Sequence, residues 1–137
     1  MTKEFWFNLP VKDVQKSKAF FTRIGFAPNP RFGDSDNQAS LYIGEKQVVL
    51  MLFPEAAFKQ FTGTEIPDLT NGSQVLFSID AQSKEEVDEL LEKVVEAGGT
   101  IFSKPKDQGW MYGAGFADLD GHRWNVLYMD ASKMPTP

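Results

Sequence analysis

The sequence predicts an α+β fold in which two βαβββ modules pair into a curved mixed sheet around a central cleft. The order strand, helix, three strands occurs twice, in residues 1–61 and again in residues 73–130, with a linker at 62–72 between them. Neither module could cover its own apolar sheet face alone. We therefore expect a single domain over residues 1–137, which is also usual for a chain of this length.

The first module opens with a short aromatic and apolar stretch, Glu4–Val11, which is typical of a strand. Asp13 then stands as a candidate N-cap for a helix with one apolar face, and Gly25 is placed to end that helix. Residues 26–38 are rich in Pro, Gly, Asn and Asp, a composition that predicts a short strand and a loop.

The rest of the first module contains two further strands. The apolar stretches 40–44 and 47–53 flank a turn at Glu45 and Lys46, so they predict a hairpin. Residues 54–61 could form one or two helical turns.

The second module repeats the pattern with a clearer helix. Residues 73–80 predict a strand, and Ser83 with Glu86 forms a capping box that marks the start of a helix. Gly98 and Gly99 end the helix. Its apolar face is predicted to contain Val87, Leu90, Leu91, Val94 and Val95.

Three strands are expected after this helix, at 100–105, 109–118 and 123–130, with a turn at 118–121 between the last two. We interpret Asp118 and Asp120 as turn-forming residues, because an exposed turn offers no burial that could separate the pKa values of an acid–base pair.

Composition narrows the classes of function. The absence of cysteine excludes disulfides, zinc–thiolate sites and cysteine nucleophiles. The net charge of −5 argues against a nucleic-acid partner and mildly favours a cationic or neutral ligand. No apolar run approaches the roughly 20 residues that span a bilayer, and the N-terminus does not resemble a signal peptide. We expect a cytoplasmic protein without a membrane partner.

Three segments resemble a known superfamily. NLPVKDVQKSKAFFTRIGF and FADLDGHRWNVLYM, together with the segment around the second helix, resemble the vicinal oxygen chelate superfamily. This superfamily includes glyoxalase I, extradiol dioxygenases, fosfomycin-resistance enzymes and bleomycin-binding proteins. The resemblance covers nearly the whole chain and implies the same fold. It also implies that His122, the single histidine, is a turn residue and not a ligand.

The resemblance further implies four positions at which metal-using members carry ligands. Here these positions hold Trp6, Met51, Gln74 and Asn125. An indole, a thioether and two amides make a poor set for a divalent ion. If the register slips by two, Asn8 and Phe53 are the nearest substitutes, and neither rescues a metal. We therefore expect no metal and no cofactor.

The glycine-rich stretch GWMYGAG, residues 109–115, has two interpretations. It is either a strand whose glycines permit a bend, or a mobile lip on which Trp110 and Tyr112 stack against a ligand. The sequence does not decide between them.

Three functional hypotheses follow. The first, which we favour, is a metal-free protein that binds a small organic molecule in an apolar, aromatic cleft, as bleomycin-binding relatives do, and that forms a homodimer as relatives of this size often do. The second is a lyase, dioxygenase or isomerase resembling glyoxalase I, with Tyr112, Tyr128 and Asp80 as candidates for proton transfer. The third is an interaction module whose cleft is filled by its own side chains. Whether the protein is an enzyme stays open.

Overall fold

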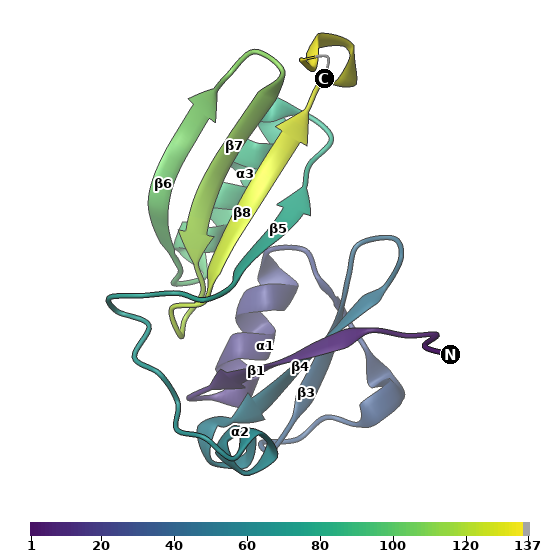
Figure 1. The fold of residues 1–137 in the computed structure, drawn as a ribbon, viewed down its shortest axis with the longest axis vertical. Helices are drawn as coiled ribbons and strands as arrows, with labels where there is room; N and C mark the ends of the chain where they lie inside the picture. The colour runs from purple at the N-terminus through teal and green to yellow at the C-terminus, as the bar shows by residue number, and fades with distance from the viewer. Residues whose placement is uncertain (136–137) are drawn as a thin grey trace. The chain divides into compact units, whose positions relative to one another are not determined.

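The computed structural model describes residues 1–135. The chain divides into two compact units, Met1–Asp68 and a second unit that begins at Leu69, and Figure 1 shows the elements of each. The first unit contains, in order, β1 (Trp6–Val11), α1 (Val14–Arg23), β2 (Ala27–Pro28), a 3-10 turn η1 (Pro30–Phe32), β3 (Ala39–Ile43), β4 (Val48–Pro54) and α2 (Glu55–Thr62).

The second unit repeats this order. It contains β5 (Leu76–Asp80), α3 (Lys84–Glu96), β6 (Thr100–Asp107), β7 (Met111–Ala117), β8 (Arg123–Met129) and a final 3-10 turn η2 (Ala131–Lys133). The predicted strand at 73–80 begins only at Leu76, and the predicted strand at 100–105 continues to Asp107.

Each unit holds one four-stranded mixed sheet. The strand order is β1-β4-β3-β2 in the first unit and β5-β8-β7-β6 in the second. In both, the first and last strands of the module run parallel, and the other pairs are antiparallel. The α+β class and the two βαβββ modules are thereby confirmed. The joining of the modules around one cleft stays a prediction.

The helix starts follow from capping. The carboxylate of Asp13 accepts a hydrogen bond from the backbone N–H of Lys16 at 3.0 Å, which satisfies one free donor of the first turn of α1. At α3, Ser83 accepts from the N–H of Glu86 at 3.1 Å. The Glu86 carboxylate returns to the N–H of Gln82 at 3.1 Å, one residue before the cap itself.

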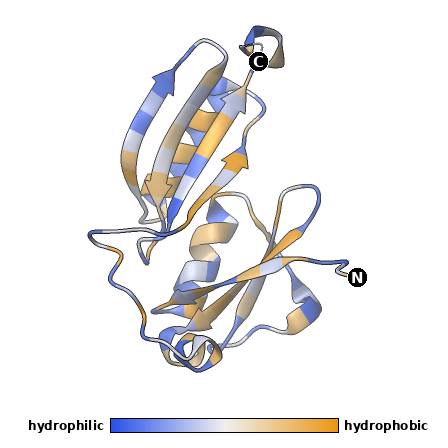
Figure 2. Cartoon of the chain, in the orientation of Figure 1, coloured by the Kyte–Doolittle hydropathy of each residue, from blue (hydrophilic) through white to orange (hydrophobic). Residues whose placement is uncertain are grey.

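In the first unit, α1 packs on β3 and β4. Its buried residues include Phe20 and Phe21, whose rings meet edge to face with centroids 5.2 Å apart. The strands contribute Leu9, Val11, Leu41, Leu50 and Leu52 to this core, all of them buried. Figure 2 shows hydrophobic and hydrophilic residues on both α1 and α3, as expected of helices with one buried face.

In the second unit, α3 packs on β6, β7 and β8. Val87, Leu91 and Val94 are buried, as predicted. Val95, predicted on the same apolar face, is 56% exposed. At 3.6 residues per turn, Val95 lies about 80° around the helix from Val87, at the margin of the face that the sheet covers.

No helix within residues 1–135 combines the length and apolar character needed to cross a membrane.

Candidate functional site

The orientation of the Tyr112 side chain shows which face of the second sheet is covered by α3. Its hydroxyl donates a hydrogen bond to the carboxylate of Asp88 on α3 at 2.7 Å, so Tyr112 points toward the helix. Side chains alternate along a strand and partners in register share a face. The opposite, helix-free face of the second unit is therefore formed by Leu76, Ser78, Asp80, Gly113, Gly115, Arg123, Asn125 and Leu127.

The first sheet brings together four of the predicted site residues. Asn8 lies beside Met51 on the parallel pair β1–β4, Pro10 lies beside Phe53, and Trp6 is two residues before Asn8. The alternate positions on these strands include Leu9, Leu50 and Leu52, which are buried, and α1 packs on β4. Trp6, Asn8, Met51 and Phe53 thus share the face of the first sheet opposite α1, where Trp6 is 45% exposed, Met51 is buried and the Phe53 ring meets Phe61 of α2 edge to face.

The repeat identifies equivalent positions in the two units. Asn8 is five residues before the N-cap of α1, and Ser78 is five residues before the N-cap of α3. Their strand partners are Met51 and Asn125. The pair Asn8–Met51 is therefore equivalent to the pair Ser78–Asn125. Sequence reasoning missed Ser78, although counting back from the Ser83 cap would have found it.

The chemistry of these two pairs is neutral. They offer two amides, one hydroxyl and one thioether, and none of these carries the negative charge that offsets a divalent ion. Within residues 1–135, no group of three or more His, Asp or Glu side chains is placed to hold a metal. The donor set therefore does not fit the divalent metal that metal-using relatives bind.

Three of these side chains are free to bind another molecule. The side chains of Asn8, Ser78 and Asn125 make no hydrogen bond with any residue among 1–135, and Asn8 and Ser78 are exposed while Asn125 is half-buried. On the first sheet, in contrast, Ser40 is already occupied, because its hydroxyl accepts from the amide of Asn29 at 3.0 Å. Unpaired polar groups on a sheet face are the kind of group that orients a ligand.

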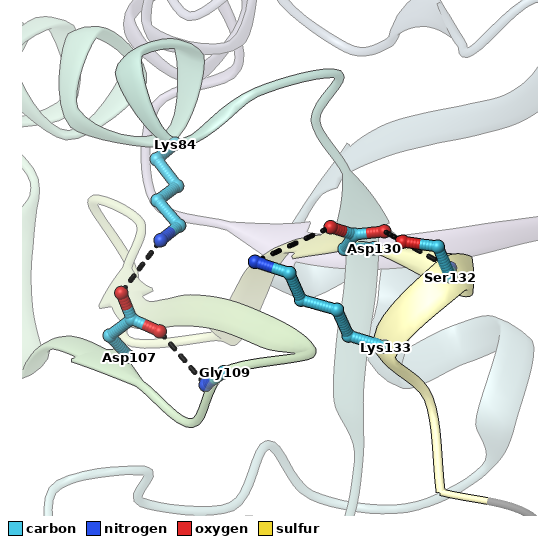
Figure 3. A network of polar contacts seen from close by, with 6 residues as sticks. All are labelled: Lys84, Asp107, Gly109, Asp130, Ser132 and Lys133. Atoms are coloured by element: carbon cyan, nitrogen blue, oxygen red, sulfur yellow. Dashed lines mark hydrogen bonds and ion pairs between the residues drawn. The ribbon is translucent and has the colours of Figure 1, made fainter.

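The structure does not bring the remaining predicted residues to these faces. Gln74 is exposed and precedes β5. Trp110 lies in the turn before β7, where its carbonyl accepts from the N–H of Asp130 at 2.7 Å. The same turn is held by Asp107, which accepts from the N–H of Gly109 at 2.9 Å and pairs with Lys84 (Figure 3).

The candidates for proton transfer are separated as well. The hydrogen bond to Asp88 raises the pKa of Tyr112, so its hydroxyl is a poor base at neutral pH. Tyr128 pairs with Tyr112 and lies on the same helix-covered face, whereas Asp80 lies on the helix-free face. The three side chains do not form a cluster.

The glycines of β7 explain the strand interpretation of GWMYGAG. A Cβ at Gly113 would lie 2.4 Å from the side chain of Leu127, and one at Gly115 would lie 2.4 Å from the ring of Phe102. Side chains of neighbouring strands thus cross β7 where a side chain of its own would collide with them.

The turn after β7 is less exposed than expected. Asp118 is 6% exposed, and its carboxylate accepts from the N–H groups of Asp120 and His122 and from the indole N–H of Trp124. Burial raises the pKa of Asp118, and the charge of His122 and these hydrogen bonds oppose that shift. The aspartate forms the turn, as predicted, but the premise of an exposed turn was wrong. His122 occupies the turn position assigned to it.

Two hollows lie elsewhere on the units. One, of about 370 Å³, is lined by residues of α2 and of the segment after it. The other, of about 410 Å³, lies between α3 and β6. Neither is lined by a residue of the sheet faces opposite α1 and α3 described above.

Comparison with known protein families shows to which superfamily the chain belongs. The family model described as the Glyoxalase/Bleomycin resistance protein/Dioxygenase superfamily matches residues 5–126. The chain belongs to this superfamily. Its similarity to hypothetical protein SA1046 from S. aureus extends over 93% of this chain and 94% of that one, with 34% identity and a TM-score of 0.81.

More distant superfamily structures share the fold. A family enzyme from Burkholderia phytofirmans is 19% identical, with 90% and 96% of the two chains covered and a TM-score of 0.75. The fosfomycin resistance protein FosX from Listeria monocytogenes, solved with Mn(II) and sulfate, is 20% identical, with 97% and 94% covered and a TM-score of 0.68. No curated protein matches the chain.

Proposed function

We propose that this superfamily member binds a small organic molecule without a metal, through the sheet faces opposite α1 and α3. The observation that supports the proposal is the side-chain chemistry of the equivalent pairs Asn8–Met51 and Ser78–Asn125. They are neutral, and their amides and hydroxyl have no hydrogen-bond partner within residues 1–135. Apolar and aromatic neighbours with a few free polar groups are the usual composition of a small-molecule site.

The alternative is a metal-dependent lyase or dioxygenase. The Listeria relative was solved with Mn(II), so metal binding exists in the superfamily. In this chain it would require ligands outside the two equivalent pairs, because an amide, a hydroxyl and a thioether compete poorly with water for a divalent ion.

Metal content tests the proposal directly. The purified protein is soaked with nickel, zinc, iron or manganese, desalted, and measured by mass spectrometry. We expect almost no bound metal with all four ions, and then a ligand screen by thermal shift should find small molecules that raise the melting temperature. A stoichiometry near one metal per chain would overturn the proposal and favour the metal-dependent alternative.

We also propose that the protein works as a homodimer in the cytoplasm, on the strength of the superfamily resemblance. Light scattering of the purified chain measures the first point: a molar mass near 31 kDa, twice the 15.4 kDa of one chain, is expected, and a mass near 15.4 kDa would contradict it.

A further inference from the structure

We propose that the helix-free face of the second unit binds the carboxylate of a small organic acid, and that Arg123 holds this carboxylate. The inference rests on the proposed small-molecule function and names a class of ligand for it. Arg123 is the first residue of β8, two residues before Asn125 on the same face. The guanidinium carbon lies 4.2 Å from the centroid of the Phe102 ring.

Packing against β7 fixes the position of the Phe102 ring. Phe102 belongs to β6, and its ring crosses β7 at Gly115, where an added Cβ would lie 2.4 Å from the ring. Gly115 is thus the residue that lets the ring lie against β7. Beyond it, on β8, the ring supports Arg123. A guanidinium stacked on an aromatic face is attracted to the ring and has fewer conformations to lose when it binds a ligand.

The hydrogen-bonding capacity of Arg123 is unused. Apart from the stack on Phe102, its side chain has no ion pair or hydrogen bond with any residue among 1–135. Arg31 in the first unit differs, because it makes two hydrogen bonds to the carboxylate of Glu4, at 2.9 and 3.2 Å. Stacking leaves the N–H groups at the guanidinium edge available, and their fork matches the two oxygens of a carboxylate.

The neighbours of Arg123 suit the rest of such a ligand. Leu76, beside Arg123 on β5, is 53% exposed and offers apolar surface. Asn125 lies about 7 Å along the strand, at about 3.3 Å per residue. Its strand partner Ser78 adds a hydroxyl, and neither side chain has a partner within residues 1–135. One molecule the size of an aromatic acid spans these groups.

For an anion bound beside Arg123, nearby charges matter more than the net charge of the chain. The chain carries −5 overall, which by itself disfavours an anion. On this face the acidic side chain of β5 is that of Asp80, four residues after Leu76. That spacing is about 13 Å along the strand and exceeds the screening length of about 8 Å at physiological salt, so Asp80 acts weakly on a ligand at Leu76. In the turn before β8, the carboxylate of Asp118 is occupied by the N–H groups of Asp120 and His122 and by the indole of Trp124.

Binding of benzoate and benzamide to the full chain tests the inference. These probes have the same ring and differ in charge. Nitrogen–proton NMR spectra recorded during each titration should show benzoate shifting the amide signals of strand β8 around Asn125, with binding at least about ten-fold tighter than that of benzamide. Equal binding of the two probes would refute the carboxylate assignment.

Variants assign the effect to Arg123. Arg123→Gln should weaken benzoate binding at least about ten-fold and leave benzamide unchanged. Arg123→Lys, which keeps the charge but loses the fork, should give an intermediate loss and serves if the glutamine variant folds poorly. Arg31→Gln is the matched control and should bind benzoate as the wild type does. Unchanged benzoate binding in both Arg123 variants would overturn the proposal.

Inorganic phosphate distinguishes an organic acid from a simple anion site. It should bind more weakly than benzoate, because it cannot use the apolar surface at Leu76, and equal or tighter binding would refute the ligand class. Failure of this inference is separable from failure of the proposed function. A protein that binds benzamide as well as benzoate remains a metal-free binder, whereas a protein that retains metal does not.

Discussion

Asp118 shows how much a single residue can do in a turn. One carboxylate satisfies two backbone N–H groups and the indole N–H of Trp124, at 3.0 to 3.1 Å. Sequence reasoning recognised the turn from its residue types but not the burial of this carboxylate. Burial depends on Trp124, whose ring stacks on Phe116 with centroids 6.3 Å apart, and such packing cannot be read from the turn residues alone.

We expect Asp118→Asn to destabilise the fold by about 2 kcal/mol, since a buried N–H loses an acceptor. The single carbonyl oxygen of Asn can still accept from the backbone, but its NH₂ group would then face the indole N–H of Trp124. Urea unfolding of the variant measures the loss. In a Trp124→Phe background, which lacks the indole N–H, the same substitution should cost clearly less. An identical cost in both backgrounds would contradict this explanation.

At the scale of elements, capping and periodicity predicted where helices begin, while strand ends were less well predicted. Asp13 and Ser83 cap α1 and α3 as expected, because a cap requires only local hydrogen bonds. The start of β5 at Leu76 depends instead on where its partner β8 begins, at Arg123. Pairing between distant strands is not encoded in the local residue pattern, so the predicted strand began three residues too early.

The contact between the first residue of α3 and the end of β6 predicts a pH effect. The hydrogen bond from Lys84, at 2.7 Å, lowers the pKa of Asp107 (Figure 3). A carboxyl whose pKa is lower in the folded state stabilises the fold above its unfolded pKa, and this contribution is lost as pH falls through the folded pKa. The contact therefore weakens in acid.

Lys84→Met should raise the pKa of Asp107 toward its ordinary value, without restoring it fully, because the N–H of Gly109 still donates to this carboxylate. An NMR titration of the Asp107 side-chain carboxyl carbon measures the change. Lys93→Met, on the same helix, is the control and should leave the titration unaltered. A shift of equal size in both variants would show that general charge, and not the direct contact, sets the pKa.

At the scale of the whole molecule, the repeat predicted the fold, and the structure shows which of the candidate site residues share a sheet face. The two βαβββ modules were evident from element order. Within the first sheet, Trp6, Asn8, Met51 and Phe53 share a face, as period-two alternation requires. In the second, Gln74 lies outside β5 and Tyr112 lies on the face toward α3. Register across strands cannot be read from the local sequence, and in the structure it places Ser78 beside Asn125.

This register makes a prediction about engineered metal binding. Ser78 and Asn125 are neighbours on parallel strands and share a face, so Ser78→His with Asn125→Glu places an imidazole and a carboxylate side by side, at a strand spacing of about 4.8 Å. We expect this double variant to bind nickel or zinc about ten-fold or more tightly than the wild type, as measured by calorimetry.

The matched control, Gln74→His with Asn125→Glu, introduces the same two groups with the histidine outside β5, and it should gain little. Equal affinities for the two double variants would mean that position on the sheet does not matter, and the equivalence of the two units could then not be used to locate a site. A gain confined to the Ser78 variant would show that the fold provides the geometry of a metal site at this position, and would support the proposal that the natural side chains there do not bind a metal.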